Sequence, residues 1–260
     1  MKKLMTVFAL LAAMTISGTI AGTAMAGEKL RIGVEGAYPP FSWVDPDGTL
    51  KGFDIEIAMA LCKEMGAQCS LVQQDWDGII PALLARKYDA IIASMSITEK
   101  RKKKVNFTQM YYNSPAKFAR RKGSGIKITK EGLKGKTVGV QRATTHDDFI
   151  TAVFGDEVTI KRYGTQDEAY LDAEAGRLDL LLADSIAMND GFLSTPAGKD
   201  WEFVGPGFND PKYFGAGAGI AVRKGDAKLL GALNKAIDTI LANGVYKRIN
   251  DKYFDFDIHG

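Results

Sequence analysis

The chain has 260 residues, 46% of them hydrophobic and 25% charged, which is enough for one large domain or two smaller ones. Its formal net charge is only +3, so composition gives no global bias toward nucleic acid or a membrane surface. The only basic run, residues 101–104, is also short. Both observations argue against a nucleic-acid-binding protein.

The first 26 residues have the pattern of a secretory signal. Lys2 and Lys3 form a basic start and residues 4–16 are apolar. Residues 24–26 have small side chains at the first and third positions, the pattern that precedes a signal-peptidase cleavage site. The apolar run is too short and too interrupted for a membrane span of about 20 residues. We expect export to the periplasm with residues 1–26 removed. A lipid anchor is disfavoured, because the cleavage site contains no cysteine.

Strands and helices are predicted to alternate from residue 29 onward. The predicted elements are a strand at 29–34, a helix at 53–66, a strand at 69–74, a helix at 77–87 and a strand at 88–94. Ile57, Leu61 and Met65 form one helical stripe, and Gly66 is a good residue to end it. This alternation predicts an α/β fold with parallel strands.

The only two cysteines, Cys62 and Cys69, are seven residues apart. In an exported chain a pair this close is most simply a disulfide. Two reduced, buried thiols are the alternative. Metal ligation is disfavoured because no histidine or further cysteine lies nearby.

The stretch "ASMSITEKRKKKV" (93–105) has an unusual charge pattern. Thr98 is a plausible helix N-cap, and four basic residues, 101–104, follow in what would be the first turn. A helix N-terminus already carries partial positive charge and favours acidic residues. We therefore expect an anion to bind here.

The α/β pattern then begins again. "GKTVGV" (135–140) resembles "KLRIGV", a helix with a capping box is predicted at 165–176, and "GRLDLLLADS" (176–185) resembles "RKYDAIIASM". The segments 112–118 and 213–224 are predicted to cross between the two units, and a last amphipathic helix covers 227–244.

Two lobes with a cleft between them follow from this organisation. Lobe 1 is predicted to comprise residues 27–114 and 215–260, and lobe 2 residues 115–214. Each lobe is expected to have a parallel or mixed sheet with flanking helices, and two strands form the hinge. Ligands bind at the carboxyl ends of such strands, where "EGAY", "ASMSIT", "QRATTHD" and "ADS" place polar side chains.

The chain resembles the periplasmic solute-binding proteins for polar amino acids, which include the lysine/arginine/ornithine and histidine receptors. The resemblance is carried by "YPPFSWVDPDGTLKGFDIEIAMALC", "IIASMSITEKR", "TVGVQRATT", "AGRLDLLLAD" and "KYFDFDIHG". It implies a type II periplasmic-binding-protein fold that closes on an amino acid and delivers it to a membrane ABC importer. It also implies a monomer without cofactor or metal.

The resemblance assigns the groups that hold the amino acid's backbone. Arg101 would grip the α-carboxylate, a role that suits the rigid fork of a guanidinium. Ser94 and Ser96 would add hydrogen bonds. From the second lobe, Thr144 and Thr145 would contribute to the carboxylate site, and Asp184 would receive the α-ammonium.

The resemblance also assigns the groups around the ligand's side chain. Tyr38 and Trp76 would sandwich its aliphatic or cationic part, and Glu35 would pair with a distal cation. Ala93 stands where the family commonly has a serine, Met95 lies in the same block, and Gln141 would also line the pocket. Arginine, lysine, ornithine and histidine are the expected ligands, with an opine or glutamine as alternatives.

An enzyme and a sensor lobe are the remaining alternatives. Cyclohexadienyl dehydratases share this fold and would also need the grip of Arg101, but generic catalytic motifs in the chain are incomplete. His146 is interpreted as a surface residue at a helix start rather than a base. A sensor lobe of a channel or kinase is disfavoured because no transmembrane helix follows "YFDFDIHG".

Overall fold

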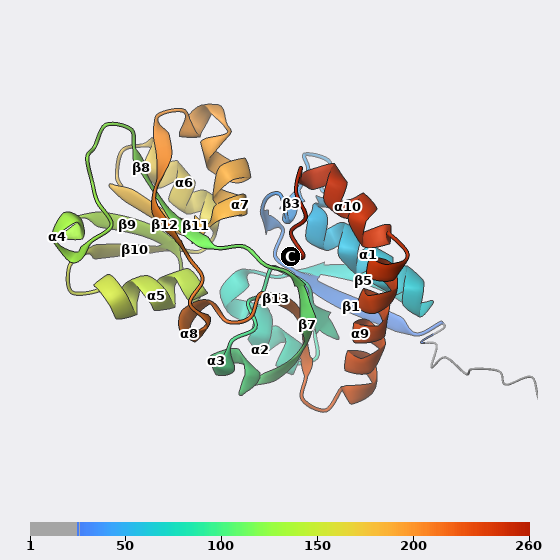
Figure 1. Cartoon of the computed structure of the whole chain (residues 1–260). Helices are drawn as coiled ribbons and strands as arrows, with labels where there is room; N and C mark the ends of the chain where they lie inside the picture. Colours follow the sequence, from blue (N-terminus) through green and yellow to red (C-terminus); the bar gives the residue numbers. More distant parts are fainter. Residues whose placement is uncertain (1–24, 26) are drawn as a thin grey trace, which may run out of the picture.

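The molecule has two lobes, each built on its own five-stranded sheet (Figure 1). The computed structural model describes residue 25 and residues 27–260, so the predicted signal at 1–26 lies outside the described residues apart from Met25. Helices pack on both sheets, and the chain passes between the lobes twice. The expected two-lobed α/β fold is confirmed.

The first lobe contains a mixed sheet in the order β5-β1-β6-β13-β7. Its strands are β1 (Lys29–Val34), β5 (Gln68–Gln73), β6 (Ala90–Ile91), β7 (Val105–Tyr112) and β13 (Ala218–Arg223). Strand β1 pairs in parallel with β5 and β6, whereas β13 is antiparallel to β6 and β7. The carboxyl ends of β1 and β6 therefore meet at one edge, where polar side chains follow.

Helices cover this sheet on both faces (Figure 1). They are α1 (Phe53–Met65), the 3-10 turn η1 (Trp76–Gly78), α2 (Ile79–Leu84), α3 (Glu99–Lys102), α9 (Ala227–Ala242) and α10 (Val245–Tyr253). The predicted stripe on α1 is buried in the core, and α1 ends at Gly66 in a left-handed conformation with φ 66°. A small antiparallel sheet, β2 (Ala37–Tyr38), β3 (Ser42–Val44) and β4 (Leu50–Lys51), lies beside it.

The second lobe repeats the plan with the order β10-β9-β11-β8-β12. Its strands are β8 (Ala116–Arg121), β9 (Thr137–Gln141), β10 (Thr159–Tyr163), β11 (Leu180–Asp184) and β12 (Trp201–Phe208). Its helices are α4 (Lys130–Leu133), α5 (Thr145–Phe154), α6 (Gln166–Glu174), α7 (Ser185–Met188), η2 (Asn189–Leu193), η3 (Pro196–Gly198) and α8 (Pro211–Phe214). The predicted capping box of Thr165 and Glu168 begins α6 and is confirmed.

The two crossings are shorter than the sequence predicts. The first runs from the end of β7 to the start of β8, over residues 113–115, and the second from Phe208 to Ala218. Residues 218–223 were expected in a crossing but form β13, a strand buried between β6 and β7. The lobe boundaries at 114/115 and 214/215 stay our proposal.

The segment from 88 to 104 also differs from prediction. Strand β6 has only two paired residues, because the chain turns at Ser94, which has φ 51°. Thr98 caps α3 as expected by accepting a hydrogen bond from the Arg101 amide, but α3 is a single turn that ends at Lys102. An anion site at a helix N-terminus is therefore not formed, and anion binding must rest on the Arg101 side chain itself.

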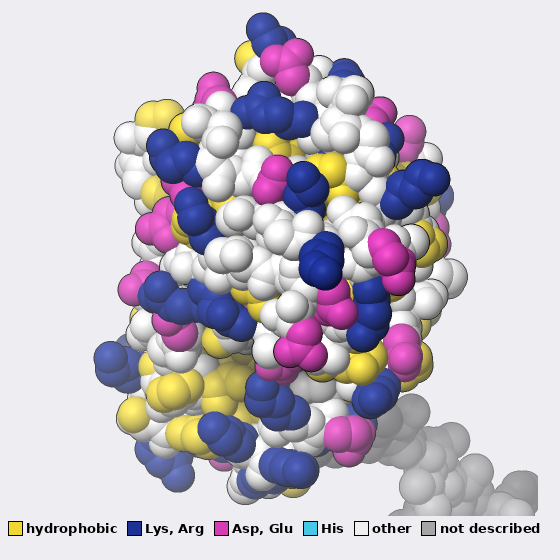
Figure 2. Space-filling view, turned by 90° about the vertical axis from the view of Figure 1, so that its left-hand side faces the viewer, with side chains coloured by type: hydrophobic (Ala, Val, Ile, Leu, Met, Phe, Trp, Pro, Cys, Tyr) yellow, Lys and Arg dark blue, Asp and Glu magenta, His cyan; other side chains and the backbone are white. Residues whose placement is uncertain are grey.

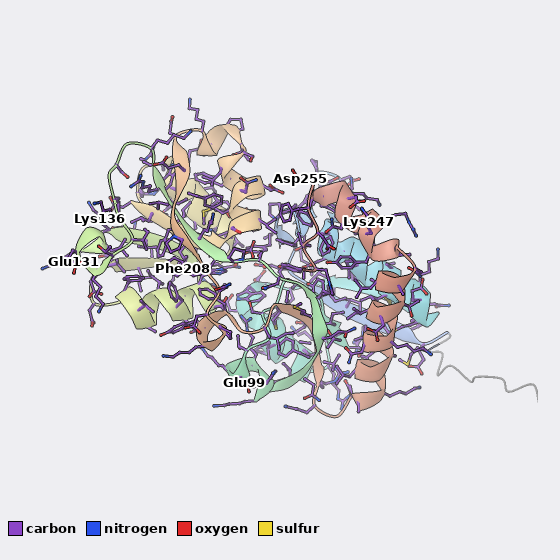
Figure 3. All side chains as sticks on the ribbon, in the orientation of Figure 1. Glu99, Glu131, Lys136, Phe208, Lys247 and Asp255 are labelled. Carbon is purple, nitrogen blue, oxygen red and sulfur yellow. A yellow bond between two sulfur atoms is a disulfide. The ribbon has the colours of Figure 1, made fainter. Side chains whose placement is uncertain are left out.

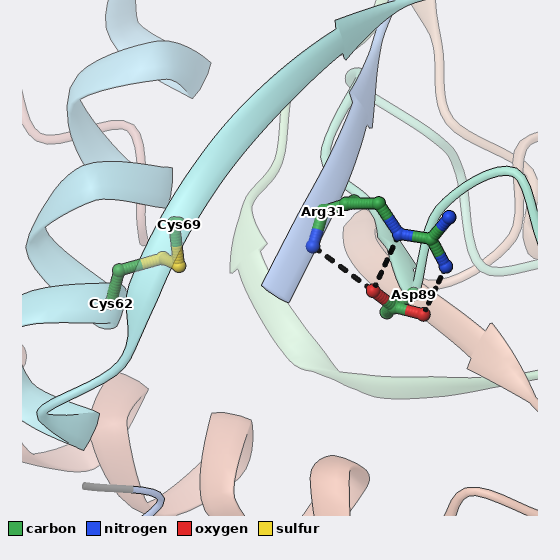
Figure 4. The surroundings of a disulfide bond; sticks show 4 residues. All are labelled: Arg31, Cys62, Cys69 and Asp89. Carbon is green, nitrogen blue, oxygen red and sulfur yellow. Dashed lines mark hydrogen bonds and ion pairs between the residues drawn. A yellow bond between two sulfur atoms is a disulfide. The ribbon is translucent and has the colours of Figure 1, made fainter. Parts of the chain in front are cut away.

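The predicted disulfide between Cys62 and Cys69 is confirmed and ties α1 to β5 (Figure 4). In the same view Arg31 on β1 pairs with Asp89, with 3.0 Å between Nη2 and Oδ1.

Within the described residues, no helix combines the length and apolarity that a membrane crossing needs.

The end of the second lobe carries charges of both signs. Figure 2 shows Lys and Arg side chains interspersed with Asp and Glu over this face. In Figure 3, Glu131 and Lys136 mark this end, Lys247 and Asp255 lie on the first lobe, and Phe208 lies near the crossing between them. No large field of one sign covers the face in view, in accord with the low net charge.

Candidate ligand-binding site

A cavity of about 30 Å³ lies between the lobes. Its wall is formed by β2, by residues that follow β1, β5 and β6, by the end of β9 and by the start of α5: Glu35, Tyr38, Trp76, Ala93, Ser94, Ser96, Arg101, Gln141, Thr144, Thr145 and His146. All but His146 are site residues that the sequence predicts. Parallel strands end at the same edge of each sheet, so residues far apart in sequence meet here.

Arg101 supplies a positive charge to the cavity wall. Its Nη1 donates a hydrogen bond to the Ser96 carbonyl at 3.0 Å, and its guanidinium carbon lies 5.1 Å from the centroid of the Trp76 ring. Burial lowers the pKa of Arg101 to about 10, partly opposed by Asp148, so it stays charged at neutral pH. Among the described residues no carboxylate forms an ion pair with it. Most of its donors therefore remain able to bind an anion.

Glu35 places a buried carboxyl in the same cavity. It is 5% exposed and accepts a 2.5 Å hydrogen bond from Nε2 of Gln141, which reaches it from the second lobe. Burial raises the pKa of Glu35 to about 8, and the charge of Asp167 adds to this increase. A cation beside Glu35 would have the opposite effect and favour the carboxylate.

Trp76 and the cavity rim connect the two lobes. The Trp76 indole Nε1 donates to the Ala143 carbonyl at 3.2 Å. At the exposed rim, Lys100 pairs with Asp148 at 2.8 Å and Arg142 pairs with Asp77. Exposed pairs of this kind each contribute about 0–1 kcal/mol, so the rim weakly favours the closed arrangement.

The block at 93–96 divides between the cavity and the core. Ser94 and Ser96 line the cavity, whereas Met95 is fully buried and packs with Trp76 in the core of the first lobe. The chain turns at Ser94, which has φ 51°, and the Met95 side chain packs into the core, so the prediction that Met95 lines this cavity is not met. Its side chain borders a neighbouring groove instead.

Asp184 lies in an adjoining cavity rather than in the first one. That cavity shares five lining residues with the first, Tyr38, Ser94, Ser96, Thr145 and His146, so the two lie side by side. Asp184 ends β11, and its Oδ1 accepts hydrogen bonds from the amides of Ile186 and Ala187 at 2.8 and 3.1 Å. Burial raises its pKa to about 7 against the opposing effect of these donors.

The second lobe presents the start of α5 to the cavity. Thr144 caps α5 by accepting from the Asp147 amide, and its hydroxyl donates to the Gln141 carbonyl at 2.8 Å. Ala143, just before the cap, has φ 59°. A non-glycine residue in this region is uncommon. The turn therefore directs the first residues of α5 toward the other lobe.

His146 lines the cavity but is not among the predicted site residues; its predicted position at a helix start is confirmed. It is half-buried at the start of α5 and lines both cavities. Burial, followed by the nearby charge of Arg101, lowers its pKa to about 3, so the ring is neutral at pH 7. Its position directly after Thr145, a predicted site residue, was the sequence feature that could have identified it. Within the described residues, no group of three or more His, Cys, Asp or Glu side chains could hold a metal ion.

Two lobes that enclose a cavity, with a cationic and an acidic group on its wall, are typical of a receptor for a small solute. The family match agrees with this class. Residues 30–256 match the bacterial extracellular solute-binding proteins, family 3, and the chain belongs to this family.

Named relatives and a solved structure support the assignment. The chain is 52% identical to the L-arginine-binding protein of Pseudomonas aeruginosa, over 100% of this chain and 99% of that protein. It is 42% identical to the histidine-binding periplasmic protein of Escherichia coli, over the full length of both. A structure of an arginine-specific periplasmic binding protein from Salmonella typhimurium aligns with a TM-score of 0.80 at 36% identity, over 88% of this chain and 100% of that one.

Proposed function

We propose that this protein binds a basic amino acid, with arginine as the favoured ligand, and delivers it in the periplasm to a membrane ABC importer. One observation carries the proposal: a single cavity contains the unpaired guanidinium of Arg101 and the buried carboxyl of Glu35. These two groups complement the α-carboxylate and the distal cation of arginine. The 52% identity with an arginine-binding protein supports this choice of ligand.

Each remaining group has a role in this binding mode. Arg101 binds the α-carboxylate with two parallel hydrogen bonds, as guanidinium and carboxylate geometry favours. Thr145 and the neutral His146 border the same part of the cavity. Asp184 and Ser94 receive the α-ammonium, and the aromatic faces of Tyr38 and Trp76 pack along the aliphatic part of the side chain.

Binding and lobe closure are coupled in this mechanism. Arg101 and Glu35 belong to the first lobe, whereas Gln141, Thr145 and Asp184 belong to the second, so the full set of contacts forms only when the lobes meet. A ligand that contacts both lobes stabilises the closed state by its differential affinity for that state. The importer would then distinguish the closed form from the open one.

Binding without turnover, by a single chain, is part of the proposal. The named relatives are binding proteins. The buried acidic groups Glu35 and Asp184 have roles in binding the two cationic ends of the ligand.

Calorimetric titration tests this function. Mature protein, unfolded and refolded to remove copurifying ligand, is titrated with arginine, lysine, ornithine, histidine, glutamine and octopine. We expect one-to-one binding with arginine tightest and a dissociation constant in the micromolar to nanomolar range, about 8 to 12 kcal/mol. The same protein is also incubated with prephenate. Conversion of prephenate, without binding of any amino acid, would contradict the proposal and indicate an enzyme.

Gly191 offers a test of closure away from the ligand. It lies on η2, where an added Cβ would be 3.2 Å from Cε2 of Tyr170 and 3.4 Å from Cγ of Pro39 on the first lobe. The substitution Gly191→Leu is expected to hold the lobes apart and to weaken arginine binding by roughly 10-fold, a cost of about 1.4 kcal/mol. Small-angle scattering of the arginine-saturated variant should show a less compact molecule.

Gly231→Leu is the matched control for this experiment. Gly231 lies on α9, and an added Cβ there would have no heavy atom within 4 Å. Its arginine affinity should equal that of the original protein. An unchanged affinity in Gly191→Leu would show that contact between η2 and the Pro39 loop does not limit closure.

A further inference from the structure

Asp54 is a buried carboxyl that does not line the cavity but lies directly behind it. It is in the first turn of α1, is 0% exposed and has no ion-pair partner among the described residues. Burying an unpaired carboxyl is costly unless hydrogen bonds satisfy it. Its two oxygens therefore depend on the donors around them.

Two hydroxyl groups supply these hydrogen bonds. The Tyr111 hydroxyl donates to Oδ1 of Asp54 at 2.8 Å, and the Ser94 hydroxyl donates to Oδ2 at 2.9 Å. The Ser94 amide in turn donates to the Tyr111 hydroxyl oxygen at 3.2 Å. The three residues thus form a closed ring of hydrogen bonds, with Ser94 held by both its backbone and its side chain.

Ser94 needs such support because of its backbone. Its φ of 51° lies in the left-handed region, which is unfavourable for a non-glycine residue. Such conformations persist where surrounding contacts impose them. Ser94 is also a lining residue of the cavity, so the ring of hydrogen bonds fixes a group that faces the ligand.

The direction of the Ser94 hydrogen bond determines what the ligand meets. A serine hydroxyl has one proton and two lone pairs, and here the proton points to Asp54. While Asp54 is ionised, only lone pairs remain for the cavity. Burial raises the pKa of Asp54 to about 7, so this state predominates above pH 7. The hydroxyl can accept a hydrogen bond from an ammonium group but cannot donate one to a carboxylate.

We propose that Asp54 is a positioning residue that makes Ser94 a hydrogen-bond acceptor for the ligand's α-ammonium. This inference rests on the proposed function and deepens it, because it assigns the ammonium a second carboxylate that acts through a hydroxyl. Asp184 lies on the other lobe, so the two carboxylates act on the ammonium from the two sides of the cleft. The arrangement selects ligands that carry an α-amino group.

Asp54→Asn tests the inference, with arginine and 5-guanidinopentanoic acid as probes. The second compound is arginine without its α-amino group. An asparagine amide can donate to the Ser94 oxygen, which frees the serine proton to point toward the ammonium. We expect arginine affinity to fall by roughly 10- to 100-fold, while affinity for 5-guanidinopentanoic acid changes less than about 3-fold.

Two further variants separate positioning from general stability. Tyr111→Phe removes one donor to Asp54 and the acceptor of the Ser94 amide but leaves the Ser94 hydroxyl bond. Both affinities should therefore fall together, and their ratio should stay close to the original. Ser94→Ala should lower arginine affinity selectively, and adding Asp54→Asn to it should change the ratio no further. Ser94→Ala also keeps the test valid if Asp54→Asn fails to fold.

The possible outcomes are distinct. An equal loss for both probes in Asp54→Asn, or no loss for either, would overturn the role of Asp54. A nonselective effect of Ser94→Ala would overturn the acceptor role of Ser94. Failure of the original protein to bind arginine would instead contradict the proposed function.

Discussion

Arg101→Ala is expected to abolish measurable binding of every amino acid. The guanidinium carries the positive charge that we assign to the α-carboxylate, which all amino acids share. Removing one partner of a buried, hydrogen-bonded charge pair costs about 3–5 kcal/mol, or roughly 100- to several-thousand-fold in affinity. The alanine also leaves the Ser96 carbonyl without its donor and the Trp76 ring without its cation.

The measurement is calorimetric titration with arginine, lysine and glutamine. Lys103→Ala is the matched control, because Lys103 follows Arg101 closely in the chain but is exposed and does not line the cavity. It should bind arginine within about 2-fold of the original protein, as is usual for exposed side chains. If Arg101→Ala retains arginine affinity within 10-fold, our placement of the α-carboxylate is wrong.

Glu35→Gln is expected to discriminate between ligands. Glutamine keeps the size and the hydrogen-bonding capacity of the side chain but cannot become negative. Arginine affinity should fall by roughly 100-fold, because an ionic partner of a desolvated cation is lost. Affinity for neutral glutamine should change less than about 3-fold, and an unchanged arginine affinity would contradict the assignment of Glu35 to the distal cation.

The same residue predicts a dependence of binding on pH. With its pKa raised to about 8, Glu35 is mostly protonated at pH 7. Because its pKa is raised, the folded protein holds protonated Glu35 more favourably than the unfolded chain does. This contribution to the free energy of unfolding is complete below the unfolded pKa near 4.5 and is lost as pH rises through the folded pKa of about 8. A guanidinium favours the carboxylate, so arginine binding at pH 7 should release a proton from Glu35, and affinity should increase with pH up to about 8.

Titrations at pH 7 in two buffers of different ionisation enthalpy measure this proton release. Asp54 and Asp184 also have raised pKa values of about 7, so the proton count of the original protein alone is not diagnostic. The difference between it and Glu35→Gln isolates Glu35. We expect the variant to release fewer protons, and equal proton release in both proteins would contradict the prediction.

Local patterns in the sequence were sufficient to predict the α/β plan of both lobes. Hydrophobic periodicity and end signals, such as Gly66 after α1 and the capping box before α6, act over a few residues and are readable locally. The rule that ligands bind at the carboxyl ends of parallel strands indicated where to look. The resemblance then assigned residues such as Arg101 and Glu35, which do meet in one cavity.

The tertiary structure decided the features that depend on residues distant in the chain. Met95 packs with Trp76 in the core, although Ser94 and Ser96 on either side of it line the cavity, and α3 stops after one turn although Thr98 caps it as predicted. Asp54 reads as an ordinary acidic residue in a helix's first turn; only folding brings it to Ser94, 40 residues away. Burial and neighbours at such distances set hydrogen-bond direction and pKa, and local sequence contains neither.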